Sequence, residues 1–185
     1  MPPPVAALDA DVLVPIIACD FLLTAFDHGL YEPVVSVIAL DEVERTLNDD
    51  FPNLTADVVR FRVDAMRDAL ADQLIDPDPS DAPDAINAKD RHVVAAALAG
   101  EAALLVSNDN ALRQQVDRAA IALRAVTLDE FALDLSERSA DGVNEVIDAL
   151  VSKRTRRPVT RAELLVALAK PFPRMVAALA DASDA

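Results

Sequence analysis

The sequence predicts an α/β protein in which a parallel sheet carries helices on both faces. Short apolar runs of strand length alternate with amphipathic helical stretches up to about residue 135, an alternation typical of parallel sheets. Beyond that point only helical patterns continue. We therefore expect a sheet domain over residues 1–135 and a helical extension over residues 136–185 that packs on it or beside it.

Composition limits the classes of function. Hydrophobic residues make up 52% of the 185 residues, which is enough for a packed core. No apolar run approaches the roughly 18 residues of a membrane helix, and the N-terminus lacks the basic start of a signal peptide. Cys19 lies in an apolar run, where it is expected to be a buried thiol. These features favour a cytoplasmic protein without a membrane partner.

The net charge of −15 disfavours a broad nucleic-acid interface, because phosphate contacts require Lys and Arg. The charge is unevenly distributed, however. Residues 150–174 carry a single acid, Glu163, and many basic residues: Lys153, Arg154, Arg156, Arg157, Arg161, Lys170 and Arg174. This segment is either a solvated helix face or a surface that binds phosphate or a partner.

The first half of the chain begins with a strand over 5–8 that ends at Asp9. A helix over 20–28 follows, with Gly29 as its stop, and then a short extended piece over 31–35. Ser36 caps a helix that continues to about 48, and Thr55 caps a longer helix that continues to about 73. Residues 74–83 are rich in Pro and Asp, which predicts an extended acidic loop.

The central stretch over 87–110 organises the second half. Asp90 opens a helical pattern that Gly100 ends, and an apolar strand over 102–106 then stops at Ser107-Asn108-Asp109-Asn110. A helix over 111–119, a strand over 121–126 and a helix over 128–135 complete the sheet region. Three further helices are expected over 142–151, 160–169 and 173–179, with Thr160 and Glu163 forming a capping box.

Four carboxylates therefore fall at element ends that a parallel sheet would bring to one edge. Asp9 and Asp109 follow strands, Glu42 lies early in a helix and Asp90 opens one. Carboxylate oxygens suit Mg²⁺ or Mn²⁺, whereas a zinc site would need more His and Cys than the chain offers. With 32 acids in the chain, chance placement on the surface is the competing explanation.

The chain resembles PIN-domain endoribonucleases of the kind that act as toxins in type II toxin–antitoxin (VapBC-like) systems. The likeness covers residues 5–180 and rests on the order and spacing of several pieces. They are LDADVLVP, CDFLLTAFDHGLYEPVVS leading into LDEVERTL, DRHVVAAALAGEAALLVSND, and a helical tail with a Phe-Pro segment before its last helix. The resemblance implies a three-layer α/β/α fold, an RNA substrate, a cognate antitoxin, and a homodimer or toxin–antitoxin hetero-oligomer.

The resemblance also implies roles for individual residues. The four acids of the family fall on Asp9, Glu42, Asp90 and Asp109, which would hold one or two divalent cations that activate a water for attack on an RNA phosphodiester. Asp11, Ser107 and Asn108 would support these ligands. The chain departs from its relatives at Asn87 and Lys89, where an acid is common, and at Asp109, where Asn is common. Ala111-Leu112-Arg113 replaces a common Lys-Asp-Phe.

Several alternatives stay open on the sequence alone. Glu44 flanks the apolar stripe of its helix more closely than Glu42 and is the alternative second acid. Arg91, Arg154, Arg156 and Arg157 are candidates for RNA contact, while His92 is expected to be a packed or hydrogen-bonding side chain. A non-catalytic PIN module that binds RNA or a protein is the main functional alternative. A haloacid-dehalogenase-like phosphatase built on Asp9 and Asp11 would need a Lys that no later motif places suitably.

Overall fold

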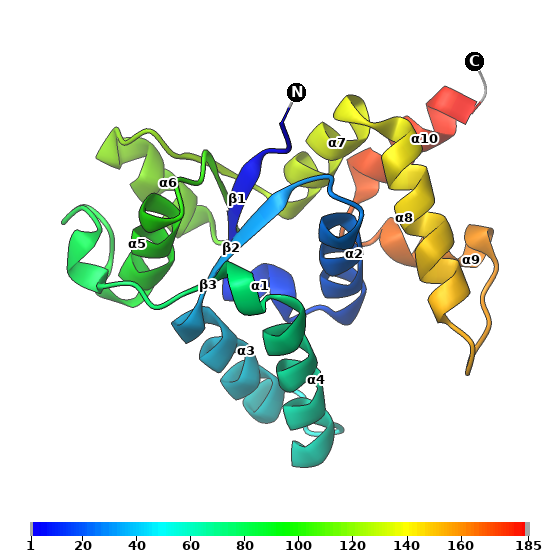
Figure 1. Cartoon of the computed structure of the whole chain (residues 1–185), viewed down its shortest axis with the longest axis horizontal. Helices are drawn as coiled ribbons and strands as arrows, with labels where there is room; N and C mark the ends of the chain where they lie inside the picture. The colour runs from blue at the N-terminus through cyan, green and yellow to red at the C-terminus, as the bar shows by residue number, and fades with distance from the viewer. Residues whose placement is uncertain (1, 184–185) are drawn as a thin grey trace.

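The computed structural model describes residues 2–183, and this part of the chain forms an α/β fold around a five-stranded sheet (Figure 1). All its strands are parallel, in the order β3-β2-β1-β4-β5. The strands are β1 (Val5–Leu8), β2 (Glu32–Ser36), β3 (Leu74–Ile75), β4 (Leu104–Val106) and β5 (Arg124–Val126). The predicted parallel α/β class is therefore confirmed.

Helices connect the strands and cover both faces of the sheet. Within the sheet region they are α1 (Ala10–Leu13), α2 (Ile16–Asp27), α3 (Val37–Asp50), α4 (Ala56–Ala69), α5 (Arg91–Ala99), α6 (Asn110–Ala119) and α7 (Leu128–Arg138). The tail adds α8 (Ala140–Lys153), α9 (Arg161–Leu168) and α10 (Pro173–Ser183). Single 3₁₀ turns lie at Ala71–Gln73, Pro79–Asp81 and Ala88–Asp90.

The two faces of the sheet bury separate hydrophobic clusters because side chains alternate along a strand. On β1, Ala6 and Leu8 join the cluster beneath α1–α4 and α7–α10, while Ala7 joins the cluster beneath α5 and α6. Gly100 ends α5 at a point where a Cβ would lie 2.6 Å from a methyl of Val34. A glycine there lets α5 pack closely against β2, which positions the start of that helix near the sheet edge.

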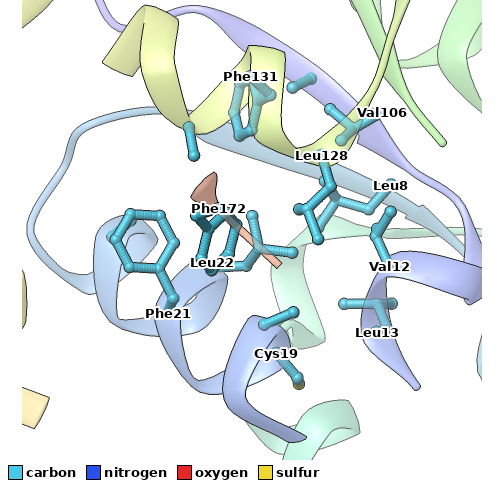
Figure 2. Close-up of a cluster of buried hydrophobic side chains, with 14 of the residues drawn as sticks. Leu8, Val12, Leu13, Cys19, Phe21, Leu22, Val106, Leu128, Phe131 and Phe172 are labelled. Atoms are coloured by element: carbon cyan, nitrogen blue, oxygen red, sulfur yellow. The ribbon is translucent and has the colours of Figure 1, made fainter. Parts of the chain in front are cut away.

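The helices after residue 138 share the larger cluster with the sheet. Phe172, which precedes α10, is fully buried and its ring centroid lies 4.7 Å from that of Phe21 on α2 (Figure 2). Phe172 therefore anchors the start of α10 in the core that the sheet region shares. Helix α7 extends to Arg138, so it crosses the expected boundary at residue 135. None of the helices in residues 2–183 is both long and apolar enough to cross a membrane.

Three local predictions were wrong. Helix α2 begins at Ile16 rather than at residue 20, because the carbonyl of Pro15 accepts hydrogen bonds from Ala18 and Cys19 and starts the helix there. Helix α4 ends at Ala69 rather than near 73, and a 3₁₀ turn follows it. The expected loop over 74–83 contains the two-residue strand β3, which tolerates the adjacent Pro and Asp because it lies at the sheet edge.

Candidate acidic active site

The carboxyl ends of β1 and β4 place the first site residues side by side. Leu8 pairs with Val106, so Asp9 and Ser107 are the next residues on two neighbouring parallel strands. The Ser107 hydroxyl donates to Asp9 Oδ2 at 2.7 Å and accepts from the Asp109 backbone N–H at 3.0 Å. One serine therefore links the acid that follows β1 to the acid that follows β4.

Asp9 and Asp11 flank the first residue of α1 and are held mainly by backbone groups. Asp9 Oδ1 accepts from the Ala10 N–H at 2.7 Å, and Asp11 Oδ2 accepts from the Asn108 N–H at 2.8 Å. The Asn108 side chain in turn accepts from the Leu128 N–H at 3.2 Å. The loops after β1, β4 and β5 are thus joined through the residues that were expected to support the ligands.

Glu42 reaches the same place from α3, whose first turn Ser36 caps by accepting from Ile38 N–H. The His92 ring lies between Ser36 and Glu42. Its Nδ1 is 3.2 Å from Ser36 Oγ and its Nε2 is 3.4 Å from Glu42 Oε2. Arg45 lies 3.6 Å from the other Glu42 oxygen. His92 is buried, as expected, and it orients Glu42.

Lys89 connects the remaining two acids. Its Nζ lies 3.5 Å from Asp90 Oδ1 and 3.3 Å from Asp109 Oδ2. Asp109 uses its Oδ1 to cap α6, accepting from the N–H groups of Ala111 and Leu112. Asp90 stands at the N-cap of α5, but its side chain accepts no capping hydrogen bond, so its carboxylate faces its neighbours in the site instead.

These side chains line one hollow of about 440 Å³ at the carboxyl edge of the sheet. Glu42 contributes to its wall and Glu44 does not. Two buried carboxylate oxygens, Asp11 Oδ1 and Asp90 Oδ2, have no hydrogen-bond partner within residues 2–183. Among the described residues, however, no three His, Cys, Asp or Glu side chains converge closely enough to form a metal-ligand set. The full lining comprises Asp9, Ala10, Asp11, Val14, Glu42, Arg45, Thr46, Lys89, Asp90 and Asp109.

The acids differ in their electrostatic surroundings. Burial raises the pKa of Asp9. The hydrogen bonds from Ser107 and Ala10 lower it in part, and the negative charges of Asp90 and Glu42 raise it further. Burial and the charge of Asp9 raise the pKa of Asp11 to about 7. Burial also acts to raise the pKa of Asp109, but the N–H groups of Leu112 and Ala111 together with Lys89 bring it below its usual value.

The arginines predicted to contact RNA lie outside this hollow. Arg91 turns toward the preceding loop, where it donates to Ile86 O and to Asp84 at 2.8 Å. Arg154 donates to the carbonyl of Leu150 and lies 3.5 Å from Asp20 on α2. Arg156 and Arg157 are exposed and line a separate depression with Lys153, Arg154, Thr155 and Val159.

Sequence reasoning missed the central place of Lys89, which it treated only as a departure from the relatives. Its position next to Asp90 was the available signal, since the long side chain of a lysine can reach the carboxylate of a neighbouring residue. The contact of Arg45 with Glu42 follows from their spacing of three on one helix. By contrast, the contact between Lys89 and Asp109 depends on how two separate segments pack.

The chain was compared with known proteins at three levels. No protein-family model, no curated protein and no solved structure matches it.

Proposed function

We propose that this chain is a divalent-metal-dependent endoribonuclease that hydrolyses RNA phosphodiester bonds, of the PIN-domain type. The observation that carries the proposal is the gathering of Asp9, Glu42, Asp90 and Asp109 from four separate segments into one hollow at the carboxyl edge of a parallel sheet. That edge is where open α/β sheets bind their ligands.

The residues of the hollow suit Mg²⁺ or Mn²⁺ by the chemistry of their donors, although no three of the described acids converge into a ligand set and their side chains would have to move together to hold a cation. All the acidic candidates offer oxygen, which hard cations prefer. Within the described residues no basic side chain pairs with Asp9 or Asp11, one oxygen of Asp11 has no hydrogen-bond partner, and the pKa of both acids is raised, so these two carboxyls lack a counter-charge. When bound, such a cation would lower the pKa of water and neutralise charge on the phosphate.

The chain's own residues would hold and orient these ligands. Ser107 fixes the Asp9 carboxylate by donating to it, and His92 and Arg45 fix Glu42 from two sides. Arg156 and Arg157 lie in the loop that follows α8, and the neighbouring Lys153 and Arg154 attach this loop to α2. These exposed arginines would contact the RNA backbone outside the acidic hollow.

A protein partner belongs to the proposal, since a cytoplasmic toxin nuclease needs a cognate antitoxin. An apolar groove between α2 and α4 supports it, with Ile16, Val58 and Phe61 exposed by 61%, 49% and 77%. The groove begins two residues after Val14, which lines the acidic hollow. An antitoxin segment with apolar side chains and a basic residue would fit both surfaces. Co-expression of the product of the neighbouring reading frame with the wild-type chain and with Phe61→Asp tests this. The wild type should co-purify with the partner, and Phe61→Asp should not.

The decisive experiment measures RNA cleavage by the full chain with Mg²⁺ or Mn²⁺ and with EDTA. Asp9→Asn and Asp90→Asn are each expected to reduce the cleavage rate by about 10²-fold or more, while Asp49→Asn, at an exposed acid near the end of α3, should leave it unchanged. Cleavage that survives EDTA or both site substitutions would refute the metal-dependent mechanism. Absence of divalent-ion binding at millimolar concentration would favour the non-catalytic PIN module.

The phosphatase alternative gains no support from the arrangement of the site. It requires a Lys that contacts the nucleophilic acid after the first strand, which would be Asp9. Lys89 instead pairs with Asp90 and Asp109.

A further inference from the structure

Lys89 occupies the position of a cation in a hollow built of carboxylates. Its ammonium lies within 3.5 Å of Asp90 Oδ1 and of Asp109 Oδ2, so it stands between acids from two different elements. Asp90 and Asp109 would also be the residues that hold a divalent cation on this side of the hollow, because Mg²⁺ prefers carboxylate oxygens. The ammonium and such a cation would therefore compete for the same negative charge.

The segment that carries Lys89 is held in place, whereas its side chain is free to leave. The Asn87 N–H donates to the buried side chain of Gln115 on α6 at 2.6 Å, and the neighbouring Ile86 is buried. These contacts keep Lys89 over the N-terminus of α6, where Asp109 lies. The Lys89 side chain itself is 67% exposed, so its ammonium can move into solvent without disturbing the core.

We propose that Lys89 is a resident counter-cation that regulates metal loading of the acidic hollow. In the metal-free protein its ammonium neutralises Asp90 and Asp109 and keeps the two segments together. A divalent cation binds only by displacing it, so Lys89 lowers the affinity for metal. This inference rests on the proposed function, because it concerns the same acids, but it makes a claim about metal binding that does not depend on RNA cleavage.

The size of the effect follows from the exposure of the ion pairs. A single exposed pair changes an equilibrium by about 1.5- to 5-fold. Two such pairs predict roughly 3- to 20-fold weaker binding of a divalent cation than in a variant without the ammonium. The same contacts predict that the metal-free variant melts at a lower temperature than the wild type, because Asp90 and Asp109 then repel each other unshielded.

Calorimetric titration of the full chain with MnCl₂ tests the proposal. Lys89→Gln should bind Mn²⁺ about ten-fold more tightly than the wild type, and Lys89→Arg, which keeps the charge, should bind nearly as weakly as the wild type. Lys170→Gln removes the same charge from an exposed position and should match the wild type. Equal affinity of Lys89→Gln and wild type would overturn the proposal while leaving the proposed nuclease intact.

A second measurement uses the wild-type protein and so does not depend on a variant folding. The chain's lysines are Lys89, Lys153 and Lys170, so selective ¹⁵N labelling gives few side-chain signals. Adding Mg²⁺ should shift the Lys89 ammonium signal and leave those of Lys153 and Lys170 in place. An unmoved Lys89 signal with bound Mg²⁺ would overturn the displacement. If neither the wild type nor a Lys89 variant binds a divalent cation, both the role proposed for Lys89 and the proposed nuclease function are refuted. If Lys89→Gln binds Mn²⁺ more tightly but the chain does not cleave RNA, only the role of Lys89 is supported.

Discussion

The acidic hollow has two sides built from the same residue type but stabilised in different ways. On the inner side, Asp9 and Asp11 are held by a hydroxyl and by backbone N–H groups, and burial raises the pKa of both. On the outer side, Asp90 and Asp109 share the Lys89 ammonium. Neutral donors fix geometry but leave charge uncompensated, whereas an ammonium compensates charge directly. The inner acids therefore retain the greater need for an added cation.

The largest expected effect separates the two sides by RNA cleavage. Asp9→Asn should reduce the rate by about 10²–10³-fold, because it removes a charge that no neighbouring side chain can replace. Asp109→Asn should cost only about ten-fold, since an amide oxygen can still cap α6 and can still face the hollow. Initial rates with saturating Mg²⁺ measure both. Equal losses would show that the two sides are equivalent in the reaction.

A smaller effect is expected from the serine that links the sides. Ser107→Ala removes the hydroxyl that donates to Asp9 and accepts from the Asp109 N–H, which should reduce metal affinity by about 10- to 100-fold. Ser107→Thr, which keeps the hydroxyl, should recover most of it. Ser136→Ala is the matched control, because it removes a buried hydroxyl that bonds only locally on α7. A loss as large in Ser136→Ala would assign the effect to general packing.

The pH dependence of stability probes the inner side without metal or RNA. The Asp11 pKa is about 7 in the folded chain against 3.8 ordinarily. Its carboxyl is largely protonated in both states below about pH 3.5, so it then carries almost no penalty. Between pH 4 and 7 the unfolded state ionises first, which destabilises the folded state, and the full penalty is present above pH 7.

Asp11→Asn should therefore match the wild type near pH 3.5, below the ordinary pKa of the carboxyl. At pH 8 in EDTA it should be more stable by roughly 1–2 kcal/mol. The gain is smaller than the full penalty on the ionised carboxyl, because the partly buried amide also loses hydration on folding. Denaturant unfolding at the two pH values measures the difference. If Asp11→Asn is more stable than the wild type by the same amount at both pH values, the charge of Asp11 is not the cause of the difference in stability.

The sequence predicted the parallel fold well because the apolar runs of β1 and β4 and the caps at Ser36 and Thr160 are local signals. It also placed Asp9 and Ser107 at strand ends, and parallel pairing then makes them neighbours. It could not reveal that Lys89 meets Asp109, because that contact joins residues 20 positions apart through the packing of a loop on α6. The edge strand β3 was missed for a similar reason: its pairing partner on β2 defines it, and its own two residues do not.

The smallest expected effect contrasts the hollow with the basic loop after α8. Arg156 and Arg157 are exposed in a segment of positive charge, whereas Arg154 is engaged with Asp20 and with a backbone carbonyl. Replacing both Arg156 and Arg157 with Gln should weaken RNA binding a few-fold at moderate salt. If each arginine contacts one phosphate of a single strand, the magnitude of the slope of log affinity against log salt should fall by about 1.4. Filter binding at several salt concentrations measures the slope.

The matched control for that variant is the double substitution Arg60→Gln and Arg118→Gln, which removes the same charge from exposed positions on α4 and α6. If the control changes the slope as much, the effect belongs to the overall charge of the chain rather than to the loop. If neither variant changes it, RNA reaches the hollow without the basic loop. The contacts that bind RNA would then lie around the acids themselves, where Arg45 and Lys89 are the basic residues of the lining.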